Sequence, residues 1–272
     1  MKQLISIEFA KLRKLNSIKI ILLIYAAMVP AWMFFLDHFY NLIITPLLPF
    51  QKALWAFPIV WNFTTFSASF FNILVGVIVV TVVCNEYNFR TMKQNVIDGM
   101  TKSQIIASKF VVVFGLATVV TLYTALAAFV LGMINHDGTS FYENSHYIFV
   151  YYLQALGYFS FAFFFALLIR KPALAIILFV VSFIAEWIIG IALTIGLKNG
   201  VYNYFPLNAF SKLTPSPLLT EFKKINEQQA AAQGKKAEII EELSLSDNVW
   251  LSVGYICIFF AIAYLVLRKR DL

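Results

Sequence analysis

Six long apolar runs dominate this sequence, and they restrict the fold to a narrow class. A helix that crosses a bilayer needs about 20 consecutive, mostly apolar residues. The runs cover roughly residues 18–36, 63–84, 110–134, 147–169, 173–197 and 249–267. Of the 272 residues, 61% are hydrophobic and 13% are charged, whereas a soluble domain is about 45–50% apolar. We therefore expect an all-α polytopic membrane protein with six transmembrane helices in a single transmembrane domain, residues 1–272.

The Lys and Arg residues are divided unevenly between the two sides of such a protein. An even number of spans places both termini on one side. The polar segments on that side hold 14 of the 21 Lys and Arg residues, and those on the other side hold seven. Cytoplasmic loops carry the excess of cationic residues. We therefore expect the protein to lie in the cell (inner) membrane with both termini in the cytoplasm. Anionic lipid then accounts for the net charge of +7, without a nucleic-acid partner.

Two further segments outside the apolar runs have a predicted structure. Residues 1–17 are basic and carry apolar residues at helical spacing, which is typical of an amphipathic helix in the membrane interface. Residues 198–248 form the longest polar segment. We expect them to be a helical extracytoplasmic loop before the last span.

The polar stretch between the second and third runs reads NEYNFRTMKQNVIDGMTKSQIIASK. Phe89, Met92 and Val96 recur at spacings of three and four, which predicts a short amphipathic helix. Gly99 is a natural stop, and Thr101 with Gln three residues later is a capping-box pattern that opens the next helix. A connector between packed helices needs only about 2–8 residues. The stretch therefore indicates either a docking surface for a cytoplasmic partner or a helix that simply lies on lipid.

Glu186 lies near the middle of the fifth run, in FIAEWIIG. An ionisable side chain at that depth costs about 2.5–3.5 kcal/mol to insert, so it must face protein or water. Two interpretations stay open. Glu186 is either a residue of a transport pathway or a structural acid that hydrogen-bonds to a neighbouring helix.

Residues for catalysis or metal binding do not gather in this sequence. It contains no G-x-x-x-x-G-K-[ST] loop for nucleotide phosphates, and no G-x-S-x-G turn for a nucleophile. Its three histidines lack the spacing of metal ligands. We therefore expect no enzyme activity, no metal and no cofactor in this chain.

The chain resembles the permease (membrane) subunits of the type-2 ABC exporter superfamily. The likeness covers the topology: six spans, cytoplasmic termini, a basic N-terminal helix and an enlarged outer loop before the last span. It is most specific over residues 86–109. There Glu86 ends the second span, Arg90-Thr91-Met92-Lys93 resembles the family's T-(L/M)-K helix, and a small-residue turn at Gly99 leads to a basic entry into the third span.

The resemblance implies how the segment over residues 85–107 works. In that family it is a coupling helix that sits in a groove of a separate cytoplasmic ATPase. Two copies of that ATPase would bind ATP and Mg, and the permease would form a homodimer, or a heterodimer with a second permease, surrounded by membrane lipid. The residues expected to dock on the ATPase are Phe89, Arg90, Met92, Lys93 and Val96, with Glu86, Gly99 and Thr101 organising the segment.

Two functions of other classes remain alternatives at this stage. One is a motor-independent channel or proton-coupled carrier that uses Glu186. The other is a non-transporting membrane anchor of a cell-envelope complex.

Overall fold

The computed structural model describes residues 8, 11–44, 54–89, 91–135, 138, 140–197, 200–217, 220 and 243–269. Within these ranges the chain is helical and contains no strand. The longer helices are α2 (Asn16–Phe39), α3 (Ile59–Ser69), α4 (Asn72–Asn88), α6 (Lys102–Ile134), α7 (His146–Ile169), α8 (Pro172–Leu197) and α11 (Leu245–Lys269). The shorter ones are α5 (Thr91–Ile97), α9 (Pro206–Ser211), the π-helical η1 (Tyr40–Ile44) and the 3-10 helix η2 (Gly200–Tyr204).

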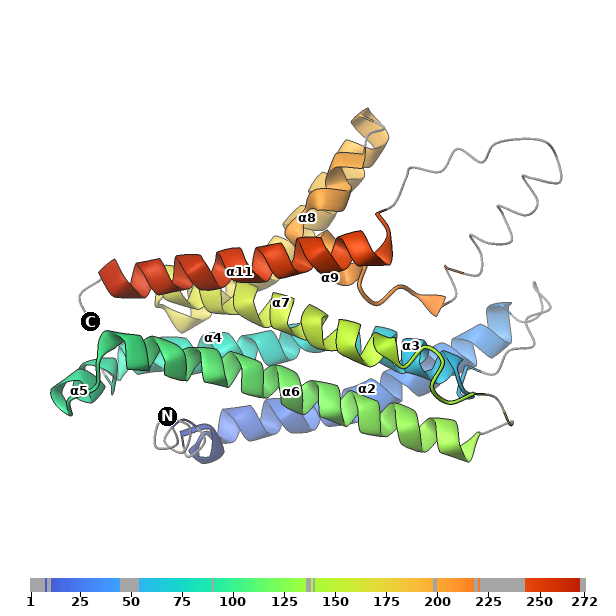
Figure 1. Ribbon diagram of the computed structural model, residues 1–272, viewed down its shortest axis with the longest axis horizontal. Helices are drawn as coiled ribbons and strands as arrows, with labels where there is room; N and C mark the ends of the chain where they lie inside the picture. Colours follow the sequence, from blue (N-terminus) through green and yellow to red (C-terminus); the bar gives the residue numbers. More distant parts are fainter. Residues whose placement is uncertain are drawn as a thin grey trace.

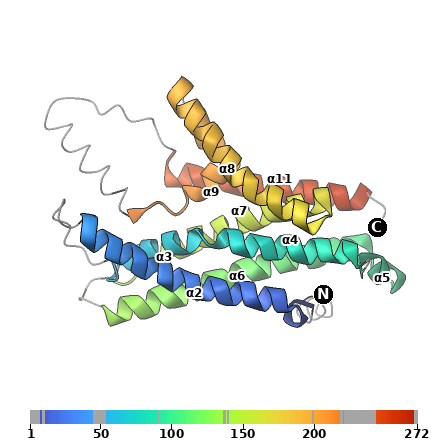
Figure 2. The same cartoon turned by 180° about the vertical axis from the view of Figure 1, so that it is seen from behind.

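The long helices run side by side as an elongated bundle (Figure 1). The start of α2, the short helix α5 and the end of α11 lie at the same end of it. Seen from behind, α2 and α6 lie together on one side of α4, and α8 leans away on the other side of α4 (Figure 2). The expected placement of both termini on one side therefore agrees with the arrangement of the first and last spans.

Five of the described helices are long and apolar enough to cross a membrane, and the bent pair α3 and α4 makes a sixth when counted as one span. Their order matches the six apolar runs of the sequence. The chain is thus an all-α polytopic membrane protein, as predicted.

The second span differs from its prediction, because it is not one continuous helix. The predicted run over 63–84 is divided into α3 and α4, whose axes meet at 46°. Near the end of α3, Thr65, Ser67 and Ser69 each donate a hydroxyl hydrogen bond to a carbonyl three or four residues back. Such bonds compete with the helix ladder and bend helices, which gives a local reason for the break at residues 70 and 71.

Among the five spans that are single helices, α7 is the most buried, and it packs against α4, α6, α8 and α11. Polar groups as well as apolar ones hold it there. The hydroxyl of Tyr151 lies 2.7 Å from that of Tyr25 in α2 and donates a 2.9 Å hydrogen bond to Asn72 in α4. A buried polar group must find a partner, so this chain of bonds fixes α2 and α4 against one face of α7.

The predicted segments outside the spans are described only in part. The predicted interfacial helix over 1–17 is described only at residue 8 and from residue 11 onward, and it is separated from α2 by the extended backbone of Leu15. The predicted outer loop, residues 198–248, is described over residues 200–217, at residue 220 and from residue 243 onward. Within it, α9 packs against α7, α8 and α11 and buries Phe210 completely.

Close packing of α9 on α7 predicts a difference between two glycines. A Cβ on Gly157 would come 2.6 Å from the ring of Phe210, whereas one on Gly254 in α11 would meet nothing within 4 Å. We expect Gly157→Ala to cost about 1–3 kcal/mol through overpacking, and Gly254→Ala to be neutral or slightly stabilising because Ala favours helix. Thermal unfolding in detergent measures both, and equal melting temperatures would contradict the packing described here.

Candidate functional site

The stretch between the second and third spans folds as two helices joined by a tight turn. At the end of α5, Gly99 adopts φ +92°, a conformation that glycine reaches without strain. Met100 N–H donates to the Asn95 carbonyl and Gly99 N–H to the Val96 carbonyl, which is the Schellman pattern of a helix end. The prediction of a stop at Gly99 is confirmed.

The next helix begins with the predicted capping box. The Gln104 amide donates to the Thr101 hydroxyl, and the Thr101 amide donates to the side-chain oxygen of Gln104 at 2.9 Å. The hydrogen bonds described above thus occupy backbone groups at the end of α5 and at the start of α6. They fix the direction of α5 relative to α6.

The outer side of α5 exposes large apolar side chains together with polar and charged ones. Phe89, which follows α4, and Ile97 are 73% and 77% exposed, and Val96 is 40% exposed. Lys93 is exposed as well. We call these four residues the α5 surface.

One of the predicted docking residues, Met92, is not part of the α5 surface. Met92 is only 2% exposed and lies on the inner side of α5, which packs on α4 and α6. It holds the helix in place and has no surface to offer a partner, so we remove it from the docking set. Arg90 lies outside the described residues. Ile97, which the sequence analysis left out, is the most exposed apolar side chain of the segment.

Where the end of α4 meets the start of α6 lies a cluster of four charged side chains, Glu8, Lys11, Glu86 and Lys109. The ammonium group of Lys109, 0% exposed, lies 2.5 Å from an oxygen of Glu86 and 2.7 Å from one of Glu8. Lys11 lies 3.1 Å from the same Glu86 oxygen and 3.4 Å from the same Glu8 oxygen. Two cations and two anions thus balance one another in a place from which water is largely excluded.

The charged cluster joins three segments that are far apart in the sequence. Glu8 comes from the N-terminal segment, Glu86 from the last turn of α4 and Lys109 from the first turns of α6. Ser108 also donates a hydrogen bond to Glu8, at 3.2 Å. Burial alone would lower the pKa of Lys11, but the carboxylates of Glu86 and Glu8 outweigh it and raise that pKa above its usual 10.5, so Lys11 stays charged.

A further contact ties the turn between α7 and α8 to the same region. The guanidinium of Arg170 lies over the ring of Tyr87, 5.0 Å from its centre, within the range of a cation–π interaction. The end of α4 therefore contacts the N-terminal segment, α6 and the α7–α8 turn at once.

The predicted pathway residue, Glu186, has partners in the structure. One of its oxygens accepts the Asn208 backbone N–H at 2.6 Å, and the other accepts the Leu207 N–H at 3.2 Å. These donors belong to the first turn of α9, whose N–H groups have no partner within the helix. Glu186 therefore caps α9 from a neighbouring span, which accounts for a carboxylate at that position.

No group of three or more His, Cys, Asp or Glu side chains within the described ranges could hold a metal ion. Cys84 and Cys257 are both free thiols.

A comparison with family models gives the family of the chain. Residues 4–196 match the model described as ABC-2 family transporter protein. This range is more than half of the chain and includes all of α5 and the charged cluster. The chain belongs to this family. A comparison with curated proteins finds no match.

As a member of the ABC-2 family, the chain is an integral membrane protein and a permease component of an ABC transporter. The sequence of this permease predicted the turn after α5, the caps of that turn and an organising role for Glu86. It did not predict the partners of Glu86. A signal for Lys109 was present. Ile105, Lys109 and Val112 lie on one helical stripe, and a Lys on an otherwise apolar stripe indicates a buried charge with a partner elsewhere.

Removing the charge of Lys109, the central cation, should disrupt the charged cluster and destabilise the protein. We expect Lys109→Met to lose about 3–5 kcal/mol of stability, because it leaves buried carboxylates without sufficient countercharge. Thermal unfolding in detergent measures the loss, and Lys171→Met, at an exposed lysine, serves as the matched control. The triple variant Lys109→Met/Glu86→Gln/Glu8→Gln should regain most of the stability. A melting temperature of Lys109→Met equal to that of the control would show that the cluster contributes little.

Truncation at Glu186 should release the first turn of α9. In Glu186→Ala the amides of Leu207 and Asn208 lose their acceptors, at a cost typical of a lost helix cap, about 1 kcal/mol. Hydrogen exchange over residues 206–211 should then be several-fold faster. Glu186→Gln keeps one acceptor oxygen and should be intermediate. Unchanged exchange in both variants would refute the capping role.

Proposed function

We propose that this permease is the membrane subunit of an ATP-driven exporter, and that the α5 surface docks on a separate cytoplasmic ATPase chain. The observation that carries the proposal is the construction of α5. It is a short helix that is capped at its end, is flanked by two helices joined through buried charges, and is exposed on its outer side. Membership of the ABC-2 family supports the same role.

The composition of the α5 surface suits a protein partner. Phe89 and Ile97 expose most of their side chains at the end of the bundle that holds the first turns of α2 and the last turns of α11. Large apolar side chains gathered on an aqueous end mark interaction sites. A basic side chain among them, Lys93, favours a groove with an acidic rim. A short helix laid into such a groove is a common recognition mode.

The charged cluster explains how movement of α5 would reach the membrane. A displaced α5 cannot move alone, because its neighbours α4 and α6 are joined by Glu86 and Lys109. Breaking that pair would leave buried charges without partners, which costs several kcal/mol. A push on the α5 surface is therefore passed to α4 and α6 together, and through α4 to α7 and α8.

The proposal assigns the chemistry of ATP and Mg to the partner chain, in two copies, one for each permease of a dimer. The proposed dimer is built on the second span and on α8, whose outer face is apolar and includes Ile184, Trp187 and Ile188. In this arrangement the permease lies in the cell (inner) membrane and α5 faces the cytoplasm. Substrate moves outward between the two permeases.

Charge placed in the α5 surface should abolish docking. We expect Ile97→Asp to weaken binding of the ATPase at least about 30-fold, the loss of one interface hot spot. Co-purification and ATP-dependent transport in vesicles measure it. Ile134→Asp is the matched control, since Ile134 is 72% exposed but ends α6 at the opposite end of the bundle.

Three outcomes separate the proposal from its alternatives. Retention of both ATPase binding and ATP-driven transport in Ile97→Asp would place the docking surface elsewhere. Transport that needs no ATPase and is abolished by Glu186→Gln would favour a channel or proton-coupled carrier. ATPase binding without any transport by the wild type would favour a membrane anchor of a cell-envelope complex.

A further inference from the structure

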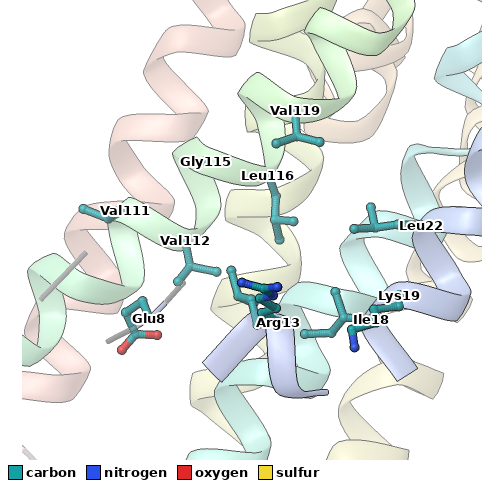
Figure 3. Close-up of a pocket in the computed structure, with 11 residues that line it drawn as sticks. Glu8, Arg13, Ile18, Lys19, Leu22, Val111, Val112, Gly115, Leu116 and Val119 are labelled. Atoms are coloured by element: carbon teal, nitrogen blue, oxygen red, sulfur yellow. The ribbon is translucent and has the colours of Figure 1, made fainter. Parts of the chain in front are cut away.

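A pocket of about 350 Å³ lies beside the charged cluster, between the N-terminal segment, α2 and α6. This volume falls within the range of small-molecule binding pockets, which is about 300–1,000 Å³. Apolar side chains form most of its lining, and they come from all three segments: Leu12, Ile18, Leu22, Val111, Val112, Leu116 and Val119. The α6 and α2 side chains face each other across it (Figure 3).

Gly115 leaves this pocket open on the α6 side. It lines the pocket and contributes no side chain, and a Cβ at this position would meet nothing within 4 Å. Any larger residue there would fill space that the present sequence leaves free. The groove between α2 and α6 is therefore open at this position.

Two cationic residues, Arg13 and Lys19, also line the pocket. Both are exposed, and neither takes part in the ion pairs of the described residues. In the view of Figure 3, Arg13 is drawn with Val112 on one side of it and Ile18 on the other. The lining also includes Glu8, whose charge is already balanced by Lys109 at 2.7 Å. The surface of the pocket is almost wholly apolar, and the two cationic side chains at its border have no ion-pair partner among the described residues.

The place of the pocket along the span specifies what can reach it. The span of α2 begins at Asn16, between Arg13 and Lys19, so both cations lie at the level where a bilayer has its headgroups. From there the groove runs along α2 to Leu22 and along α6 to Val119, in the direction of the acyl chains. Basic residues at this level attract anionic lipid.

We propose that this pocket binds one anionic phospholipid of the surrounding membrane. The phosphate lies between Arg13 and Lys19, and the upper part of one acyl chain fills the groove over Gly115. The bound lipid joins the N-terminal segment to α2 and α6 at the point where Glu8 enters the charged cluster. This site is separate from the α5 surface, and its occupancy does not depend on an ATPase partner.

Lipid titration followed by native mass spectrometry tests the site. The purified full-length protein, in a neutral detergent, is titrated with dioleoyl phosphatidylglycerol or with dioleoyl phosphatidylcholine. We expect the first molecule of phosphatidylglycerol to bind at least about tenfold more tightly than phosphatidylcholine, because two basic groups contact its headgroup. Arg13→Gln/Lys19→Gln should remove that preference.

A second variant tests the groove independently of charge. Gly115→Leu should weaken binding of both lipids about tenfold, since the added side chain starts in free space at its Cβ and extends into the place of the acyl chain. The matched controls are Lys171→Gln/Arg268→Gln, which removes two exposed cations at the same end of the bundle, and Gly254→Leu, at a glycine with equal free space in α11.

Two results would overturn the proposal. One is equal affinity for the two lipids in the wild type. The other is a loss of lipid binding in the control variants as large as in the pocket variants, which would mean that lipid adheres to the whole basic end of the bundle. Melting temperatures of all variants within a few degrees of the wild type show that the comparison concerns binding.

Discussion

The buried pairing of Lys109 with Glu86 and Glu8 is the interaction on which one end of the molecule depends. A charge removed from water costs several kcal/mol unless its partners are close and correctly placed. Lys109 meets both carboxylates within 2.7 Å. Because the partners lie 23 and 101 residues away along the chain, this requirement positions three segments at once.

The position of the α5 surface depends on that charged cluster. Helix α5 has only seven residues, too few to be stable in isolation. Its inner side is held by Met92, its end by the turn at Gly99, and its flanking helices by the charges. A helix fixed in this way can transmit a displacement, which is the property that a docking element of an ABC-2 permease needs. The proposed lipid pocket borders the same cluster through Glu8 and would add to its rigidity.

Several elements could be predicted because they follow from local patterns. Each transmembrane helix satisfies its backbone hydrogen bonds internally, so an apolar run of sufficient length determines a span without reference to its neighbours. The capping box at Thr101 and the stop at Gly99 are also local, since each involves residues a few positions apart. The bend between α3 and α4 was not predicted. Its hydroxyl bonds are local, but Thr and Ser also occur in straight helices.

The sequence by itself determined the membrane class, the number and order of the spans and the two helices of the α5 turn, because hydropathy and capping act over short distances. Only the tertiary structure decided the partner of each polar group. It placed Glu186 on the first turn of α9, turned Met92 inward and brought Glu8 to Lys109. The reason is physical: a buried polar or charged group is stabilised by whichever partner the fold brings within hydrogen-bonding distance, and that partner has no fixed separation along the chain.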